Sequence, residues 1–268
     1  MAEDHGETEG PKPEPPERRE PPGSSGDHPL ARMLLVGAIV SAIGVGLVLL
    51  IDWFPPVASS GAQSVDTLYD VTLGVAIPIF VLVMTVAIYS VVRFRARPGD
   101  TRDGAPIHGS ARLEVLWVAV PTLIVSALAA YSWIVLDDLE ARASDPLRVS
   151  VRGQQFAWTF QYPQPGGPPV QSEQLVLPVG RQADFTIQAA DVIHSFWVPA
   201  FRIKQDAVPG IKTQTRTTPM RTGSFDVVCA ELCGAGHSTM RQNVRVVPRA
   251  EFDRWLAGKR AAAAGGQG

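Results

Sequence analysis

The sequence predicts a mixed fold, in which transmembrane helices in the N-terminal half precede an all-β sandwich in the C-terminal half. Three uncharged apolar runs, at residues 33–51, 71–92 and 115–136, are each about 20 residues long. A helix rises about 1.5 Å per residue, so each run can cross a hydrocarbon core about 30 Å thick. Beyond Asp145, short stretches that alternate apolar and polar residues are separated by turn residues, which is typical of strands.

Composition divides the 268 residues into four segments. Residues 1–29 are acidic and rich in proline and contain almost no apolar side chain, so we expect a disordered tail there. Residues 30–140 hold the three spans, and residues 145–250 hold the β domain. Residues 251–268 are expected to form a short helix followed by a tail.

Charge indicates both the partners and the orientation of the chain. A formal net charge of -2 gives no basis for binding a polyanion, so we expect no nucleic-acid partner. The segment between the second and third runs holds five arginines, whereas the segment between the first and second runs has no Lys or Arg. The positive-inside rule places the arginine-rich segment in the cytoplasm, so the β domain is expected outside a bacterial-type cell membrane. The five arginines are Arg93, Arg95, Arg97, Arg102 and Arg112.

The first apolar run allows two interpretations. It can be a retained helix that precedes a helical hairpin, or a signal sequence that is cleaved near Ala58-Ser59-Ser60. A signal peptide normally begins with a short basic segment, whereas the region before this run is long and acidic. The sequence therefore favours a retained third helix.

The β domain is expected to be an antiparallel sandwich or barrel of about a hundred residues. Apolar and polar residues alternate with period two at residues 147–151, 185–187 and 244–246. Breaks rich in proline and glycine separate such stretches, as at residues 163–169. A stretch at residues 249–264 is predicted to close the domain as a short helix.

Metal-binding residue types concentrate in one short segment of this domain. The segment reads Cys229-Ala-Glu231-Leu-Cys233-Gly-Ala-Gly-His237-Ser-Thr-Met240, and His194 precedes it. Two thiolates, two imidazoles and a thioether form a soft ligand set, which suits copper and suits calcium or magnesium poorly. Cysteines four residues apart on a glycine-rich loop can place both sulfurs on one side, where they can bridge two metal ions.

The same residue types also occur in other kinds of site. Two cysteines in an oxidising compartment usually form a disulfide, and a single His or Met is more often an ordinary packing or surface residue. Zinc competes by ligand type, but methionine is a poor zinc ligand. Both cysteines of the chain, two of its five histidines and one of its five methionines occur in this set, which favours a metal site.

At these residues the sequence resembles cytochrome c oxidase subunit II. The family's Cu-A motif, C-x-E-x-C-x3-H-x2-M, is matched at every position, and residues 191–199 and 204–210 match its other ligand loop. The resemblance runs from about Leu68 to Trp255. It implies that the β domain is a cupredoxin-like sandwich that carries binuclear copper.

The resemblance also implies a role for each residue of the motif. Cys229 and Cys233 would bridge both coppers, and His194 and His237 would each bind one copper. Met240 would be a weak ligand to one copper. The Glu231 carbonyl would bind the other copper, while its carboxylate would face a magnesium ion shared with subunit I.

The function implied is that of an electron-transfer subunit. Such a subunit accepts electrons from a cytochrome c-like donor and passes them to the haem and copper centres of subunit I. There oxygen is reduced to water with proton translocation, and subunit III is a further expected partner. Haem groups are expected only in the partner subunit.

Three residues outside the motif gain expected roles from the resemblance. Glu114 precedes an aromatic at the head of the third span, where the family places the entrance of a proton channel, and the predicted topology puts it on the cytoplasmic side. Phe156 and Trp158 lie in the aromatic strand that passes electrons to the copper. Phe156 occupies the position where the family usually has a tryptophan that receives the electron. The resemblance therefore does not identify which residue of this strand receives the electron first.

Alternative functions differ in what they require of the sequence. A quinol oxidase subunit II has the same scaffold but lacks the copper ligands, and a nitrous oxide reductase carries its Cu-A domain on a large soluble enzyme. A membrane-anchored protein that binds or delivers copper through redox-active cysteines is the non-oxidase alternative. It gives no role to Glu114 or to the Glu231 carboxylate.

Overall fold

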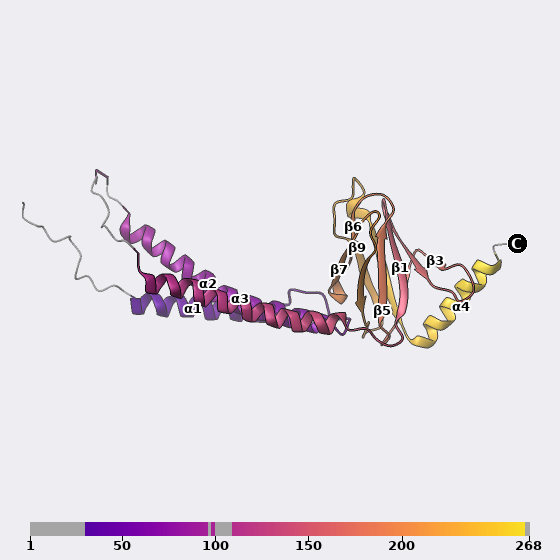
Figure 1. Ribbon diagram of the computed structural model, residues 1–268, viewed down its shortest axis with the longest axis horizontal. Coiled ribbons are helices and arrows are strands. Elements are labelled where there is room, and N and C mark those ends of the chain that lie inside the picture. Colours follow the sequence, from indigo (N-terminus) through magenta and orange to yellow (C-terminus); the bar gives the residue numbers. More distant parts are fainter. Residues whose placement is uncertain (1–29, 96–97, 100–108, 266–268) are drawn as a thin grey trace, which may run out of the picture.

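The computed structural model describes residues 30–95, 98–99 and 109–265. The predicted disordered tail at residues 1–29 lies outside the described residues, as do Arg97 and Arg102 of the arginine-rich segment. Three long apolar helices extend from one side of a β domain: α1 (Leu30–Leu50), α2 (Ala62–Phe94) and α3 (Ala111–Glu140) (Figure 1). All three are long and apolar enough to cross a membrane, as the apolar runs predict.

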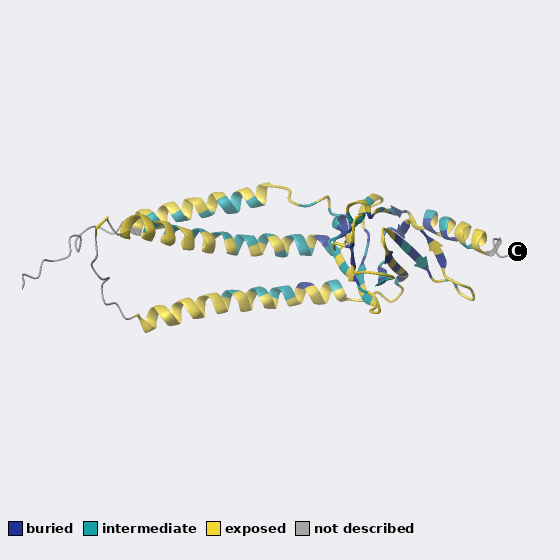
Figure 2. Cartoon of the chain, turned by 90° about the horizontal axis from the view of Figure 1, so that it is seen from above, coloured by how far each residue is buried: buried dark blue, intermediate teal, exposed yellow. Residues whose placement is uncertain are grey.

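The helices are longer than the apolar runs that predicted them. α2 begins at Ala62 and α3 continues to Glu140, so both include charged residues at the end next to the β domain. Hydrophobicity marks only the part of a helix that fits the hydrocarbon, and the same helix can continue through the polar interface. Figure 2 shows the apolar outer surfaces of the helices as exposed, as expected for surfaces that lipid or partner subunits cover.

The C-terminal half is a sandwich of two five-stranded sheets. One sheet has the strand order β3-β2-β1-β5-β8, and the other has the order β4-β10-β9-β6-β7. The strands are β1 (Leu147–Gln154), β2 (Ala157–Tyr162), β3 (Val170–Ser172), β4 (Leu175–Pro178), β5 (Ala183–Ala189), β6 (His194–Val198), β7 (Ile203–Ala207), β8 (Thr213–Thr217), β9 (Gly223–Cys229) and β10 (Arg241–Val247).

The expectation that the sandwich is antiparallel was wrong in two places. β1 pairs with β5 in parallel, and β10 pairs with β4 in parallel. Neither pair is joined by a tight turn, because several strands intervene between the partners. Turn signals in the sequence detect hairpins between consecutive strands, but they carry no information about which distant strands pair.

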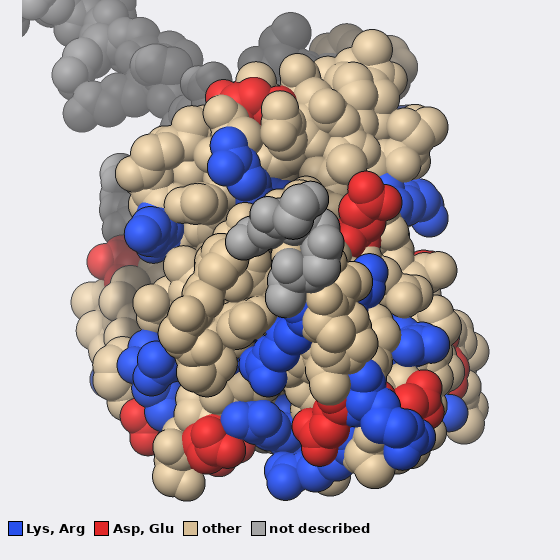
Figure 3. Space-filling view, turned by 90° about the vertical axis from the view of Figure 1, so that its right-hand side faces the viewer, with Lys and Arg blue, Asp and Glu red and all other residues tan. Residues whose placement is uncertain are grey.

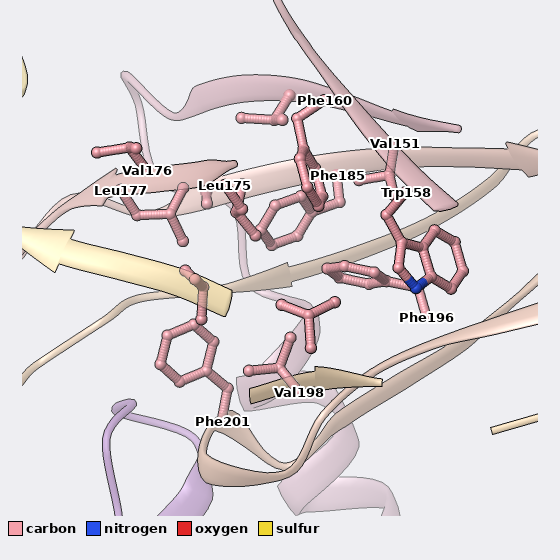
Figure 4. Packing of buried hydrophobic residues seen from close by; sticks show 14 of the residues in the cluster. Val151, Trp158, Phe160, Leu175, Val176, Leu177, Phe185, Phe196, Val198 and Phe201 are labelled. Carbon is pink, nitrogen blue, oxygen red and sulfur yellow. The ribbon is translucent and has the colours of Figure 1, made fainter. Parts of the chain in front are cut away.

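Aromatic side chains fill the space between the two sheets. Phe196 is fully buried, and its ring lies 5.6 Å from that of Trp158, 5.5 Å from that of Phe185 and 6.4 Å from that of Phe160 (Figure 4). The alternating burial of β1 follows from period-two side-chain direction, with every second residue facing this core. The core therefore lies directly beneath the strand ends that carry the predicted metal ligands.

The chain closes with α4 (Arg249–Gly265), which extends the predicted short helix by one residue. Phe252 and Leu256 of α4 are buried, and Trp255 meets the ring of Tyr162 at 5.1 Å. The face of the domain that points away from the three long helices carries more Lys and Arg than Asp and Glu (Figure 3). Most of these charged side chains gather on one part of the face, and the rest is formed by other residues.

The segment between α1 and α2 fastens the spans to the sandwich. Ala58 and Ser59 are buried against the β domain, and the Ala58 backbone N–H donates to the Ala200 carbonyl at 3.0 Å. Arg202 completes this junction with two donations to the Asp66 carboxylate, at 2.7 and 2.9 Å, and one to the Pro55 carbonyl at 2.8 Å. The small residues of the possible cleavage site, Ala58 and Ser59, are thus part of the contact between spans and sandwich.

We expect Arg202→Met to destabilise the β domain by about 3 kcal/mol, because removing one member of a buried ion pair leaves the other charge uncompensated. The Arg202 and Asp66 side chains are only 6% and 17% exposed. Chemical denaturation of the full-length subunit in detergent would measure the change. Arg181→Met is the matched control, because Arg181 pairs with Asp145 at the surface and such pairs contribute about 1 kcal/mol or less. Equal effects of the two substitutions would contradict this expectation.

Candidate metal centre

The predicted metal ligands meet at one end of the sandwich, although they come from different elements. His194 begins β6, Cys229 ends β9, and Cys233 lies in the loop that follows β9. The β9–β10 pairing returns this loop to the sheet, and the Cys229 N–H donates to the Met240 carbonyl at 3.1 Å. His237 begins a short 3-10 helix, η2 (His237–Thr239), that closes the loop before Met240.

The donor atoms form one compact group. The two cysteine sulfurs lie 3.9 Å apart, which is far longer than a disulfide bond of about 2 Å. His194 Nδ1 lies 3.9 Å from the Cys229 sulfur, and His237 Nδ1 lies 3.7 Å from the Cys233 sulfur. The Met240 sulfur lies 3.8 Å from that of Cys233. Each thiol sulfur thus has its own imidazole nitrogen.

Glu231 contributes its backbone and its side chain in different places. Its carbonyl oxygen lies 3.2 Å from the Cys229 sulfur, at the edge of the donor group. The residue itself is exposed. The carbonyl can therefore join the metal site while the carboxylate is available to a ligand or partner outside the domain.

Burial raises the pKa of one thiol of the site. His194 and Met240 are fully buried, and Cys233 is 4% exposed. Burial, followed by the charge of the neighbouring Cys229, raises the pKa of the Cys233 thiol to about 11. A soft metal ion binds the thiolate, so metal binding at this site must release a proton from Cys233.

Asp191 is a functional residue that the motif analysis did not identify. Its Oδ1 lies 2.8 Å from Nε2 of His194, so the other ring nitrogen, Nδ1, is directed at the Cys229 sulfur. Burial opposes ionisation of Asp191, but donation from the Gln155 N–H, from His194 and from the Val192 N–H outweighs it and lowers the pKa of Asp191 to about 2. The carboxylate stays charged and orients the imidazole, as the outer partners of metal-bound histidines usually do. The D-x-x-H spacing was the available sequence signal.

The aromatic strand reaches the site through Trp158. Trp158 is 1% exposed, and its ring lies 6.0 Å from that of His194. Gly153 makes this approach possible, because a Cβ there would lie 3.0 Å from the indole and 3.1 Å from the imidazole. Phe156 is 38% exposed. Its ring lies against Gly234 and Gly236 of the loop that follows β9, and a Cβ on Gly236 would lie 2.5 Å from this ring.

Glu114 is remote from this group. It lies in the first turn of α3, at the end of the helix far from the β domain. A 30-residue helix spans about 45 Å at about 1.5 Å per residue, so most of the length of α3 separates Glu114 from the β domain. Any role of Glu114 must therefore differ from metal binding.

The donor set fits a binuclear copper centre of the Cu-A type. One nitrogen of His194 and the sulfurs of Cys229 and Cys233 all lie within 4.8 Å of one another, and Met240 adjoins them. With His237 the group offers five side-chain donors, one more than a tetrahedral zinc site uses. Paired sulfurs with one imidazole each would suit two copper ions that share the soft thiolate ligands.

A sandwich with this donor group at one end and apolar helices at its base defines a membrane-anchored copper protein of the cupredoxin class. Comparison with known families then gives two matches. Residues 35–135 match the model described as "Cytochrome C oxidase subunit II, transmembrane domain", and residues 169–247 match "Cytochrome C oxidase subunit II, periplasmic domain". The chain belongs to the cytochrome c oxidase subunit II family.

Individual known proteins are similar to this chain. "Cytochrome c oxidase subunit 2" of Synechocystis sp. is 32% identical, over 84% of this chain and 81% of the relative. The protein of the same description from Thermostichus vulcanus is 34% identical, over 75% of this chain and 76% of the relative. Among solved structures, the periplasmic domain of subunit II of cytochrome oxidase of Bradyrhizobium japonicum is 31% identical, with a TM-score of 0.42, over 46% of this chain and 97% of that one.

Family membership determines the setting of the site. The protein is a multi-span membrane subunit of a haem-copper terminal oxidase, and its β domain is periplasmic. Subunit II is the electron-accepting subunit of such an oxidase. The predicted topology, with the sandwich outside the cell membrane, is thereby confirmed.

Proposed function

We propose that the periplasmic domain accepts electrons from a soluble cytochrome c-like donor at a binuclear Cu-A centre and passes them to subunit I. The observation that supports this most directly is the pair of thiol sulfurs 3.9 Å apart, each with one imidazole nitrogen within 3.9 Å. The proposed ligands are the side chains of His194, Cys229, Cys233, His237 and Met240 and the carbonyl of Glu231.

When bound, a copper pair at these ligands would supply a one-electron relay in which the charge is shared by two metal ions. The chain itself holds the ligands in fixed positions. His194 is fixed by Asp191 and by the packing of Trp158, and Cys229 is fixed by its backbone bond to Met240. Ligands that are already in place require little rearrangement when charge changes, and this lowers the barrier to electron transfer.

Metal analysis and absorption spectroscopy of the purified oxidase test this proposal. We expect two copper ions per copy of this chain beyond the copper of subunit I, together with a mixed-valence absorption in the near infrared. One copper per chain without that absorption would instead support the alternative of a copper-delivery protein with redox-active cysteines.

Two finer assignments extend the proposal. The exposed carboxylate of Glu231 is proposed to bind a magnesium ion shared with subunit I, which would place the magnesium beside the Cu-A ligands. Trp158 and Phe156 are proposed to conduct electrons from the donor toward His194, with Phe156 at the surface and Trp158 in the core. The haem groups that complete the path belong to subunit I, and subunit III is a further proposed partner.

Glu114 is proposed to collect protons at the cytoplasmic mouth of a channel into subunit I, since it lies at the membrane end opposite to the periplasmic domain. Glu114→Gln should slow oxygen consumption several-fold, and increasingly so as the pH rises and protons become scarce. The near-infrared absorption should be unchanged, because the copper ligands lie beyond the other end of α3. Asp138→Asn, near the periplasmic end of the same helix, is the matched control. Equal turnover in the two variants at every pH would refute the role of Glu114.

A further inference from the structure

Gln155 lies in the turn between β1 and β2 and touches both loops that carry metal ligands. Its backbone N–H donates to Asp191 Oδ2 at 2.8 Å, and Asp191 in turn holds His194. Its side-chain Nε2 donates to the backbone carbonyl of Cys233 at 2.6 Å. One residue that is not a proposed ligand therefore connects the segment before His194 with the loop that carries Cys233.

The loop that carries Cys233 has space for the Gln155 side chain. Gly234 follows the carbonyl that accepts the bond and has a φ of 132°, a conformation that residues with a Cβ rarely adopt. A Cβ on Gly234 would lie 2.9 Å from Gln155 Nε2 and 3.2 Å from the ring of Phe156. The glycine thus leaves the space that the Gln155 amide and the adjacent aromatic ring occupy.

The Gln155 side chain donates directly to the peptide between Cys233 and Gly234. Cys233 is 4% exposed, and its sulfur contacts those of Cys229 and Met240 as well as His237 Nδ1. Rotation of that peptide would move the Cys233 sulfur relative to all of these donors. A donor fixed on a strand turn opposes this rotation, as outer contacts of metal ligands do elsewhere.

We propose that Gln155 is a positioning residue for the copper centre, which it stabilises by holding the Cys233 carbonyl; this inference rests on the proposed function of the site. Its effect is exerted through Cys233, and Gln155 itself binds no metal. The role depends on the N–H donor of the amide and not on the bulk of the side chain.

Two substitutions of Gln155 distinguish the effect of its hydrogen-bond donor from the effect of its side-chain size. Gln155→Met keeps the length of the side chain without a donor, and Gln155→Glu keeps its shape and, at neutral pH, offers only acceptors to the Cys233 carbonyl. Gln171→Met, at an exposed position of β3, is the matched control. In the purified oxidase, we expect both Gln155 variants to lose copper to a chelator about fivefold faster than the control, the factor that one hydrogen bond supplies. Both should also show an altered copper hyperfine pattern in electron paramagnetic resonance.

A second measurement does not depend on bound copper. In the full-length metal-free subunit, alkylation of Cys233 by iodoacetamide should be about fivefold faster in both Gln155 variants than in Gln171→Met, because the loop opens more often. Gln155→Glu that behaves like the wild type while Gln155→Met does not would show that the planar, polar shape of the side chain matters and its N–H donor does not, and would overturn the proposal. Unchanged alkylation in both variants would overturn it as well. A wild type without paired copper would refute the proposed function instead, and the alkylation result would still decide the role of Gln155.

Discussion

Replacing Cys233 with serine should leave at most one copper ion in this chain and abolish its near-infrared absorption. The Cys233 sulfur lies 3.9 Å from that of Cys229, 3.7 Å from His237 Nδ1 and 3.8 Å from the Met240 sulfur, so it adjoins most of the donor group. A hydroxyl is a harder and far less acidic ligand than a thiol and cannot replace a bridging thiolate. Changes in the surroundings of metal ligands already cost about 10–100-fold in affinity or activity, so we expect oxidase turnover to fall by more than about 100-fold.

Metal analysis, near-infrared absorption and oxygen consumption of the same preparation would measure these effects together. Ser238→Ala is a suitable control, because Ser238 lies in the same loop, is exposed and is not a proposed ligand. The proposed ligand set is wrong if Cys233→Ser retains two copper ions and the near-infrared absorption. A parallel loss in Ser238→Ala would mean that the loop tolerates no change at all, and would remove Cys233 as a specific ligand.

Phe196→Ala should destabilise the periplasmic domain by about 3–5 kcal/mol, the range for removing a fully buried aromatic ring. Phe196 is fully buried, and its ring contacts those of Trp158, Phe160 and Phe185 from the facing sheet. Its backbone also pairs with that of Cys229, two residues along β6 from His194. The cavity would therefore weaken both the contact between the sheets and the base of the copper site.

Hydrogen–deuterium exchange of the β1 and β6 amides in the full-length subunit would measure this loss, because core amides exchange through global opening. Trp197→Ala is the matched control, since Trp197 is the next residue of the same strand, is 38% exposed and faces the other way. Destabilisation by Phe196→Ala no greater than that by Trp197→Ala would contradict the packing described here.

Much of the architecture could be predicted because it is encoded locally. Apolar runs predicted the three helices, and period-two alternation predicted β1, β5 and β10. The parallel pairing of β1 with β5 could not be predicted, because it joins segments that three other strands separate in the sequence. The role of Arg202 was hidden for the same reason, since its partner Asp66 lies 136 residues away.

The candidate site, too, could be predicted where it is encoded locally and not where it depends on contacts between distant segments. The segment from Cys229 to Met240 shows its ligand types and spacing directly, whereas nothing in the sequence measures how near His194 lies, 35 residues earlier. Asp191 and Gln155 act through bonds of 2.8 and 2.6 Å. The D-x-x-H spacing is a weak sequence signal for the first bond, and no sequence signal indicates the second. Both are common polar residues whose roles become visible only beside the ligands that they hold.

The sequence by itself determined that this protein crosses a membrane, which side its β domain occupies, and which soft ligands it offers to copper. These are local properties, because hydrophobic length, loop charge and ligand chemistry belong to short segments. Tertiary structure alone decided that each thiol sulfur has its own imidazole, that the sheets contain parallel pairs, and that Gln155 connects the two ligand loops. These features depend on distances between remote segments, and the packing of the whole sandwich sets those distances.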